Sequence, residues 1–325
     1  MNVSRDLIAF LFPGQGSQSV GMGKELAEKY PVARETFEEA DAALSFKLSQ
    51  LCFEGPEDKL KLTENTQPAI LTVSVAIVRI LREKGIVPDV AAGHSLGEYS
   101  AHVAAGTLAF TDAVLAVRNR GRYMQEAVPV GQGAMAAVLG LNASVVNSIC
   151  EQAAQGLVCQ AANLNSPDQI VISGAKVAVE RAAEMAKAKG AKRAIMLPVS
   201  APFHCALMQP AQDRLAADLN ALTFQAPLFP VINNVDAEPV LTAEVARQTL
   251  IRQVTGTVQW ERCVRTLSAR GVQTFVEVGP GKVLCGLMRQ IDRTKPCFNV
   301  EDEASLQKAI THLPQQVAAA EKVTV

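Results

Sequence analysis

The segment Gly93-His94-Ser95-Leu96-Gly97 has residues whose types and spacing could support nucleophilic chemistry. It matches the pattern G-x-S-x-G, in which a serine sits on a sharp turn between a strand and a helix and exposes its hydroxyl. Glycines flank the serine because side chains there would clash in so tight a turn. An apolar run at 87–92 and a small-residue stretch at 98–105 provide the strand and the helix. Ser95 is therefore the predicted nucleophile, and the alternative is a glycine-rich turn that only packs.

A serine nucleophile needs a general base, and the four histidines of the chain allow a choice by elimination. His94 directly neighbours Ser95, and adjacent side chains on a sharp turn point apart. His102 lies seven residues beyond the serine, roughly 10 Å along the following helix, and His312 is near the C-terminal end. His204, in a loop after a predicted strand, is therefore the candidate base. The alternative for His204 is a hydrogen-bonded structural role.

The group that would orient this histidine is less evident. Three aspartates, Asp213, Asp218 and Asp236, are possible third members of a triad, but each is typical of a helix surface or a turn. A backbone carbonyl can accept the hydrogen bond from the histidine instead. The sequence leaves both possibilities open.

The oxyanion formed during acyl transfer needs N–H donors. The backbone N–H of Leu96 follows the serine directly, where the turn places it for this task. A second donor is expected from the glycine-rich turn at 12–18, because glycine lets a backbone approach a ligand closely. This turn does not complete a dinucleotide-binding motif, since Ser19 stands where the third glycine would be. The Gly-Lys pairs of the chain do not complete a phosphate-binding loop either.

Arg120 lies on a helix predicted over 111–127. At 100° per residue, Ala113, Val117 and Met124 share an apolar stripe, and Arg120 falls at its edge. A guanidinium on the buried side of a helix needs an anion. That anion is either a carboxylate of the protein or a substrate carboxylate held by two hydrogen bonds.

The elements that must position these residues alternate between apolar runs and amphipathic helices, which indicates βαβ architecture. The continuous apolar run at 7–12 is typical of a strand buried on both faces of a parallel sheet. Further strands are expected at 87–92, 229–233 and 274–278, and helices at 22–30, 33–44, 68–84 and 111–127.

A second unit follows. Its strands are predicted at 135–139, 158–163, 169–173 and 193–199, with helices at 144–154 and 177–189. The order β-α-β-β-α-β is the split βαβ, ferredoxin-like pattern. We expect this ferredoxin-like subdomain at 131–198, a large α/β domain made of 1–130 and 199–313, a frayed tail at 314–325, and a substrate cleft between the two lobes.

Composition excludes several classes of protein. The 325 residues are 49% hydrophobic and 19% charged with a net charge of −1, which gives no sign of a nucleic-acid partner. The apolar run at 7–12 ends at Pro13, too short for a signal peptide or a membrane span. The seven cysteines are scattered and form no C-x-x-C pair. A disulfide framework or zinc site is therefore not expected, and a reducing cytosol fits.

A basic cluster, Lys187, Lys189, Lys192 and Arg193, ends one predicted helix and begins the next strand. Cations at a helix C-terminus stabilise the helix dipole, which is the simpler interpretation of this cluster. The alternative is a docking site for an acidic partner.

Several segments, taken together and in order, resemble the malonyl-CoA:acyl carrier protein transacylases. They span about residues 7–290 and are FPGQGSQ at 12–18, TQPA at 66–69, GHSLGEYSA at 93–101, RGRYMQ at 120–125, NLNSP at 163–167, PFH at 202–204, VQW at 258–260 and EVGPG at 277–281. The resemblance implies an α/β-hydrolase-like large domain with a parallel sheet and an inserted ferredoxin-like subdomain, in agreement with the elements predicted above.

The resemblance also implies roles for the matched residues. Ser95 would be the acylated nucleophile and His204 its base. Arg120 would bind the malonyl carboxylate, and the backbone carbonyl of Gln253 would orient His204. The remaining implied positions are the oxyanion-hole N–H groups of Gln15 and Leu96 and a substrate pocket lined by Gln67, Met124, Asn165 and Phe203.

The implied reaction moves a malonyl group from malonyl-CoA to the phosphopantetheine thiol of acyl carrier protein through a malonyl-serine ester, for fatty-acid synthesis. It requires no metal and no bound cofactor. The expected protein is a cytoplasmic monomer that binds its carrier protein through the basic cluster at 187–193. The alternatives are an acyltransferase that serves a polyketide synthase, a serine esterase of another class, and a non-catalytic acyl-CoA-binding module.

Overall fold

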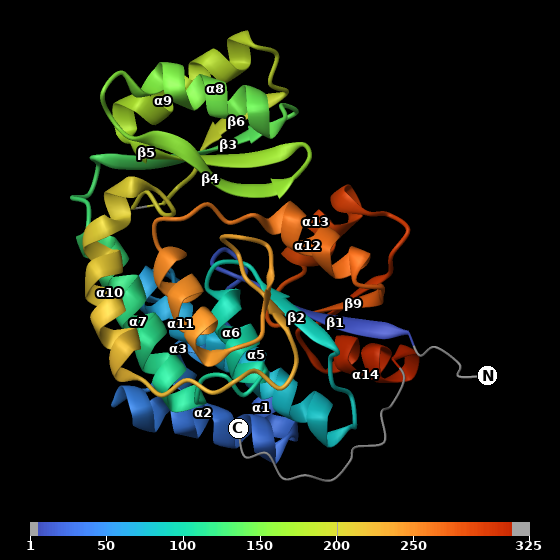
Figure 1. Cartoon of the computed structure of the whole chain (residues 1–325). Coiled ribbons are helices and arrows are strands. Elements are labelled where there is room, and N and C mark those ends of the chain that lie inside the picture. Colours follow the sequence, from blue (N-terminus) through green and yellow to red (C-terminus); the bar gives the residue numbers. More distant parts are fainter. Residues whose placement is uncertain (1–5, 200, 314–325) are drawn as a thin grey trace.

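A computed structural model describes residues 6–199 and 201–313 of the chain, so the tail expected at 314–325 lies outside the described residues. Two sheets organise the described part, and Figure 1 shows the smaller one above the larger. The larger has six strands in the order β10-β9-β1-β2-β7-β8, and the smaller has four in the order β4-β5-β3-β6.

The larger sheet is built around β1 (Leu7–Phe12). This strand pairs in parallel with β2 (Val90–Gly93) and β9 (Val272–Val278), and alternate residues enter hydrophobic cores on opposite faces. Burial on both faces explains its continuous apolar sequence and confirms the prediction of a mixed α/β fold with a parallel sheet. The outer strands are β10 (Cys297–Val300), parallel to β9, and β7 (Val231–Ile232), parallel to β2, with β8 (Pro239–Val240) antiparallel to β7.

Helices cover both faces of the larger sheet (Figure 1). The face with α12 (Trp260–Ala269) and α13 (Val283–Ile291) carries the smaller core. In the part of the chain that the structure describes, no helix is long and apolar enough to cross a membrane. The larger core receives side chains from α1 (Lys24–Lys29), α2 (Pro31–Leu44), α3 (Leu48–Glu54), α4 (Glu57–Leu60), α5 (Thr63–Glu83), α6 (Gly97–Ala104), α7 (Phe110–Glu126), α10 (Gln209–Ala221), α11 (Ala243–Arg252) and α14 (Glu303–His312).

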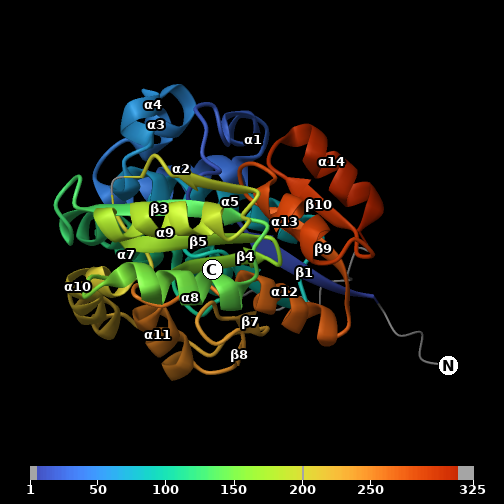
Figure 2. The same cartoon turned by 90° about the horizontal axis from the view of Figure 1, so that it is seen from above.

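The smaller sheet is antiparallel throughout. Seen from above in Figure 2, α8 and α9 lie over its outer face, where they bury a separate alanine-rich core. Its inner face carries a few apolar side chains that pack with Phe203 of the larger unit. The elements are β3 (Gly133–Leu139), α8 (Ala143–Ala154), β4 (Cys159–Ser166), β5 (Gln169–Ala175), α9 (Lys176–Ala188) and β6 (Arg193–Met196).

Several elements differ from the sequence-based expectation. The helix expected at 68–84 begins at Thr63, so Pro68 stands inside α5 instead of at its start. Proline is favoured in the first turn of a helix, where its missing N–H costs nothing, so its place inside α5 is an exception to that preference. The short helices α3 and α4 and the strands β8 and β10 were not predicted, because segments of two to seven residues show too little periodicity.

One pair of cysteines also differs from the sequence-based expectation. Cys285 on α13 and Cys297 on β10 are joined by a disulfide, with a Cα–Cα distance of 5.4 Å. The expectation that the scattered cysteines form no disulfide framework did not anticipate this bond, since it pairs residues on neighbouring elements without any recognisable spacing. The other five cysteines, at positions 52, 150, 159, 205 and 263, are free and buried.

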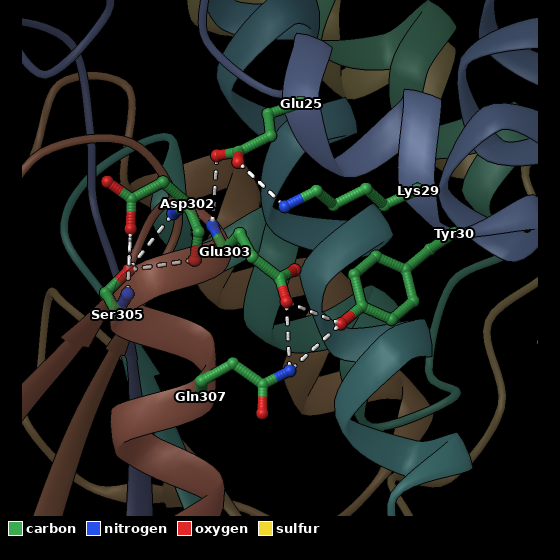
Figure 3. A network of polar contacts seen from close by, with 7 residues as sticks. All are labelled: Glu25, Lys29, Tyr30, Asp302, Glu303, Ser305 and Gln307. Atoms are coloured by element: carbon green, nitrogen blue, oxygen red, sulfur yellow. Dashed lines mark hydrogen bonds and ion pairs between the residues drawn. The ribbon is translucent and has the colours of Figure 1, made fainter.

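The last described helix, α14, is attached to the first one, α1, by a polar network (Figure 3). The Tyr30 hydroxyl donates to Glu303 Oε1 at 3.3 Å, and the Glu303 N–H donates to Glu25 Oε2 at 3.4 Å. The N-terminus of α14 is closed by a capping box between Asp302 and Ser305. These contacts are partly exposed, so each contributes little, and the apolar side of α14 supplies the main attachment.

The turn between β2 and α6 is among the most tightly packed of the fold. A Cβ on Gly93 would lie 1.9 Å from the carbonyl of Gly97, and a Cβ on Gly97 would lie 2.0 Å from the carbonyl oxygen of Phe12. Between them Ser95 has a φ of 52°, in the left-handed region that non-glycine residues rarely adopt. The sharp strand-to-helix turn expected from G-x-S-x-G is therefore present, and the two glycines are required by close backbone contacts.

Replacement of Gly97 by alanine is expected to lower the free energy of unfolding by about 3 kcal/mol, because the new methyl group overlaps backbone atoms that cannot move aside cheaply. The matched control is Gly286→Ala on α13, where an added Cβ meets nothing within 4 Å. That change should raise stability by up to about 1 kcal/mol through helix propensity. Urea unfolding measures both, and an unchanged midpoint for Gly97→Ala would contradict the close packing of the turn.

Candidate active site

A cavity of about 290 Å³ lies between the two sheets and contains Ser95. The larger unit contributes the turn at 13–17, the Ser95 turn, α7 and α13. The smaller unit contributes the inner face of β3, β4 and β5 and the segment after β6. All the pocket positions expected from the sequence, Gln67, Met124, Asn165 and Phe203, line this cavity.

Ser95 and His204 meet in this cavity although 109 residues separate them. Ser95 Oγ lies 2.7 Å from His204 Nε2, and His204 Nδ1 lies 2.9 Å from the backbone oxygen of Gln253. A carbonyl oxygen only accepts, so Nδ1 carries the proton and Nε2 presents its lone pair to the serine hydroxyl. His204 is thus oriented to remove the proton of Ser95.

The three aspartates considered as orienting groups lie elsewhere. Asp213 accepts from Gln209, Asp218 accepts from Asn119 and Tyr123, and Asp236 pairs with Arg252. None of these contacts involves His204. The backbone carbonyl of Gln253 therefore occupies the position that a carboxylate has in a Ser-His-Asp triad.

Arg120 is fully enclosed beside the serine, with 2% of its surface exposed. Its Nη1 donates to Gln67 Oε1 at 2.7 Å, and its Nη2 donates to Gln253 Oε1 at 2.9 Å and to Ser95 Oγ at 3.0 Å. These partners are amide and hydroxyl oxygens. Among the described residues no ion pair involves Arg120, so of the two anions considered for it the structure shows no protein carboxylate in direct contact.

The surroundings of His204 disfavour its charged form. Burial and the nearby Arg120 charge lower the pKa of His204 to about 3, against the smaller opposing effect of its bond to Gln253. The imidazole is therefore neutral and able to accept a proton at any pH at which the protein works.

His204 also has a φ of 57°, so both His204 and Ser95 occupy the left-handed backbone region.

The two positions expected to donate to an oxyanion both line the cavity near the serine. Leu96 follows Ser95 at the start of α6, and the turn with Gln15 approaches so closely that a Cβ on Gly14 would lie 2.5 Å from the oxygen of His94. The Gln15 side chain donates to Thr63 Oγ1 at 3.2 Å.

His94 connects the Ser95 turn to the smaller sheet. Its Nε2 lies 2.8 Å from Asn165 Oδ1, and its ring packs against Trp260 with a centroid distance of 5.5 Å. Asn165 belongs to β4, so this bond ties the smaller sheet to the Ser95 turn. These contacts agree with the prediction that the side chains of His94 and Ser95 point apart.

Sequence reasoning missed three polar groups beneath the serine. Asn234 Oδ1 accepts from the Ser95 N–H at 2.7 Å, and Asn234 Nδ2 donates to the Gly93 oxygen at 2.7 Å. Gln253 Nε2 donates to the Ser95 oxygen at 2.9 Å and to Glu98 Oε2 at 2.6 Å. A glutamate at the start of a helix made mainly of small and uncharged residues was the one available sign, because a buried carboxylate needs nearby donors.

The basic cluster at 187–193 is exposed on the smaller unit, away from the serine. Lys187 pairs with Glu184 at 2.8 Å across 52% and 73% exposed side chains. Arg193 opens β6, whose partner strand is β3 on one side only, so β6 is an edge strand. Leu197 and Val199, just beyond β6, line the cavity.

The arrangement as a whole is suited to covalent acyl transfer. A serine hydroxyl faces a neutral imidazole, and a buried guanidinium lies 3.0 Å from that hydroxyl. No cluster of residues that could hold a metal ion is found in the described ranges 6–199 and 201–313.

Comparison with known proteins gives one consistent result. The family model of the acyl transferase domain matches residues 9–320. The malonyl CoA-acyl carrier protein transacylase of Salmonella typhimurium is 51% identical over 304 residues, 93% of this chain and 98% of that protein. The corresponding protein of Bacillus subtilis is 50% identical over 310 residues, 95% and 98%.

Solved structures agree with these matches. That of the malonyl CoA-acyl carrier protein transacylase from Coxiella burnetii has a TM-score of 0.93 at 48% identity and covers 95% of this chain and 98% of its own. A malonyl-transacylase in complex with a type II polyketide synthase acyl-carrier protein has a TM-score of 0.92 at 47% identity, with 94% and 100% covered.

The lowered pKa of His204 predicts its behaviour in solution. A histidine of ordinary pKa gains a proton as the pH falls through about 6.5. His204 should instead keep its neutral ring between pH 8 and pH 5, because the proton would be buried beside Arg120. Nitrogen-15 NMR of the ring, assigned by the loss of its signals in His204→Gln, measures this. A titration midpoint between pH 6 and pH 7 would contradict the described environment.

Proposed function

Because the chain belongs to the acyl transferase family and, within it, to the malonyl-CoA:acyl carrier protein transacylases, we propose that it transfers the malonyl group of malonyl-CoA to the phosphopantetheine thiol of an acyl carrier protein. The proposal includes a malonyl ester of Ser95 as the intermediate. The observation that carries it is Arg120, a buried guanidinium 3.0 Å from the serine hydroxyl that lacks an ion-pair partner among the described residues.

In the first half of the reaction, Ser95 Oγ gives its proton to His204 Nε2 and attacks the thioester carbonyl. The C–O bond forms, and the carbonyl oxygen becomes an oxyanion that the N–H groups of Leu96 and Gln15 stabilise. Collapse of this intermediate breaks the C–S bond. The coenzyme A thiolate takes the proton from His204, which leaves malonyl-Ser95 and the free thiol.

The second half repeats these steps with another thiol. The phosphopantetheine thiol gives its proton to His204 and attacks the ester carbonyl, and Ser95 leaves and recovers the proton from His204. The carbonyl of Gln253 holds the Nδ1 proton throughout, so the ring exchanges protons only through Nε2. One site thus serves two thiols in turn, which is a ping-pong scheme.

Arg120 supplies selectivity for malonyl. Arg120 Nη2 contacts Ser95 Oγ at 3.0 Å, and a malonyl carboxylate that takes the place of this contact would form a bidentate, charge-assisted pair with the guanidinium. An acetyl group leaves the guanidinium unpaired, a penalty of about 1–3 kcal/mol. Phe203 at the cavity wall would crowd a methyl branch on the acyl carbon, which favours malonyl over methylmalonyl.

The same carboxylate would assist the base. The Arg120 charge is one cause of the lowered pKa of His204, and a malonyl carboxylate on Arg120 would oppose that charge. Malonyl-CoA would therefore make His204 a stronger base than acetyl-CoA does. Selectivity then operates on the acylation step as well as on binding.

A serine esterase of another class is less consistent with the site, because an esterase has no need of an unpaired arginine beside its nucleophile.

The remaining features of the proposal concern the whole protein. We propose an α/β-hydrolase-like domain (1–130 and 199–313) with a ferredoxin-like insert (131–198), acting as a cytoplasmic monomer for fatty-acid synthesis without metal or bound cofactor.

The acyl carrier protein would dock on the basic cluster. Lys187, Lys189, Lys192 and Arg193 are all exposed, and β6 leads from Arg193 to Leu197 at the cavity wall. Four residues of extended chain span roughly 13 Å. An acidic partner on this cluster would therefore hold its phosphopantetheine arm near the cavity.

Incubation of the wild-type protein with malonyl-CoA should add one malonyl group to the peptide that carries Ser95. Mass spectrometry of the digested protein measures this addition. Arg120→Ala should reduce malonylation at least tenfold relative to acetylation, since only the malonyl group loses a charged partner. Absence of any adduct on the wild-type protein would exclude the covalent mechanism. Equal losses for malonyl and acetyl in Arg120→Ala would exclude the role of Arg120 as carboxylate ligand.

The docking surface is tested by Lys189→Glu combined with Lys192→Glu. Each reversal should cost about 0.5–1 kcal/mol of binding, so the KM for acyl carrier protein should rise roughly fivefold to thirtyfold. Acylation of Ser95 by malonyl-CoA should stay unchanged. Lys308→Glu on the exposed side of α14 is the control. An unchanged KM in the double variant would remove this surface from the proposal.

A further inference from the structure

Glu98 has no part in the reaction described above, yet it lies directly beneath the reacting groups. It is the second residue of α6 and is completely buried. Its Oε2 accepts from Gln253 Nε2 at 2.6 Å and from the Asn234 N–H at 3.0 Å, and its Oε1 has no partner among the described residues. A carboxylate enclosed in this way is expensive to bury, which calls for an explanation.

The Gln253 side chain connects Glu98 to Arg120. Its Nε2 faces two groups that only accept, the Glu98 carboxylate and the Ser95 carbonyl. Its Oε1 faces a group that only donates, Arg120 Nη2, at 2.9 Å. The amide can satisfy these neighbours in one orientation only, since its oxygen must face the donor and its nitrogen the acceptors. Burial raises the pKa of Glu98 to about 7, and the hydrogen bonds from Gln253 and from the Asn234 N–H favour its ionised form.

We propose that Glu98 is a positioning residue for malonyl selectivity, which acts through the Gln253 amide to hold the Arg120 guanidinium beside Ser95, where it can bind the substrate carboxylate. This inference rests on the proposed function. The hydrogen-bonded chain runs from the Glu98 carboxylate through the Gln253 amide to the Arg120 guanidinium. Gln67 holds the other terminal nitrogen at 2.7 Å, so one amide oxygen restrains each side of the guanidinium.

The indirect connection matters for recognition. A carboxylate in direct contact with Arg120 would occupy the N–H groups that the substrate needs and would cancel most of its charge. An amide between them restrains the guanidinium with one hydrogen bond and leaves the other donors available. Burial lowers the pKa of the Arg120 guanidinium, and the nearby Tyr99 and Glu98 act against that shift.

Glu98 also supports the nucleophile through the same two neighbours. Gln253 Nε2 donates to the Ser95 carbonyl, and Asn234, whose own N–H binds Glu98, accepts from the Ser95 N–H. Loss of this support would slow acylation by any acyl-CoA. Loss of the Arg120 orientation would slow acylation by malonyl-CoA in particular, so the two effects can be separated by the choice of acyl group.

The experiment compares Glu98→Gln with a matched control, Glu277→Gln. Glu277 is also a completely buried glutamate, but it accepts from the N–H groups of Leu284 and Cys285 at the start of α13 and has no bond to Gln253 or Arg120. For each variant, kcat/KM for Ser95 acylation is measured with malonyl-CoA and with acetyl-CoA. Glu98→Gln should lower the malonyl-to-acetyl ratio about tenfold, mainly through the malonyl KM, because a neutral amide no longer fixes Gln253. Glu277→Gln should leave the ratio unchanged.

A third variant, Gln253→Met, removes the connecting amide and keeps the backbone carbonyl that binds His204. It should lower the ratio to a similar extent, and Glu98→Gln added to it should lower the ratio no further. An unchanged ratio in Glu98→Gln, or equal and additive losses in the double variant, would overturn the inference. Should Glu98→Gln fail to fold, Gln253→Met alone decides, and an unchanged ratio in it would also overturn the inference. Failure of the wild-type protein to form malonyl-Ser95 would instead reject the proposed function.

Discussion

The buried positive charge of Arg120 is the constraint on which the rest of the site depends. A guanidinium removed from water requires anionic or strongly polar partners, and within residues 6–199 and 201–313 this one bonds to two glutamine oxygens and the serine hydroxyl. That incomplete solvation makes the site receptive to a carboxylate. Burial and, after it, the Arg120 charge lower the pKa of His204 to about 3, so the base is neutral before substrate arrives. Arg120 thus contributes both to recognition of the acyl group and to the neutral state of the base.

The fold maintains this charge beside the nucleophile by close backbone packing. Strands β1 and β2 are parallel neighbours, so the turns that follow them lie at the same edge of the sheet. Gly97 packs so closely against the backbone of Phe12 that no side chain fits there. Residues far apart in sequence then reach the serine from the helices around it, Arg120 from α7 and Gln253 from the end of α11. The smaller sheet covers the site and is tied to it by the bond between His94 and Asn165.

Much of this was predictable from local patterns. The serine turn could be predicted because only glycines fit on either side of the serine in so tight a turn. Strand β1 could be predicted because burial on both faces requires a continuous apolar run. The pairing of Ser95 with His204 followed from the small number of histidines. What could not be predicted lies in contacts made by single side chains across long separations. The Gln253 side chain, Asn234 and Glu98 belong to three different elements, and only the folded arrangement brings their donors and acceptors together. The Cys285–Cys297 disulfide joins residues 12 positions apart, and it was missed because that spacing matches no recognisable cysteine motif.

The central claim is that Arg120 is kept without an ion pair in order to bind the carboxylate of the acyl group. A crystal structure of the protein reacted with malonyl-CoA tests this most directly. The account predicts an ester on Ser95 whose carboxylate oxygens lie within about 3.2 Å of the terminal nitrogens of Arg120, with Gln67 and Gln253 still bound to the guanidinium. A malonyl-Ser95 ester whose carboxylate points elsewhere, with Arg120 still bound to the serine oxygen, would contradict it.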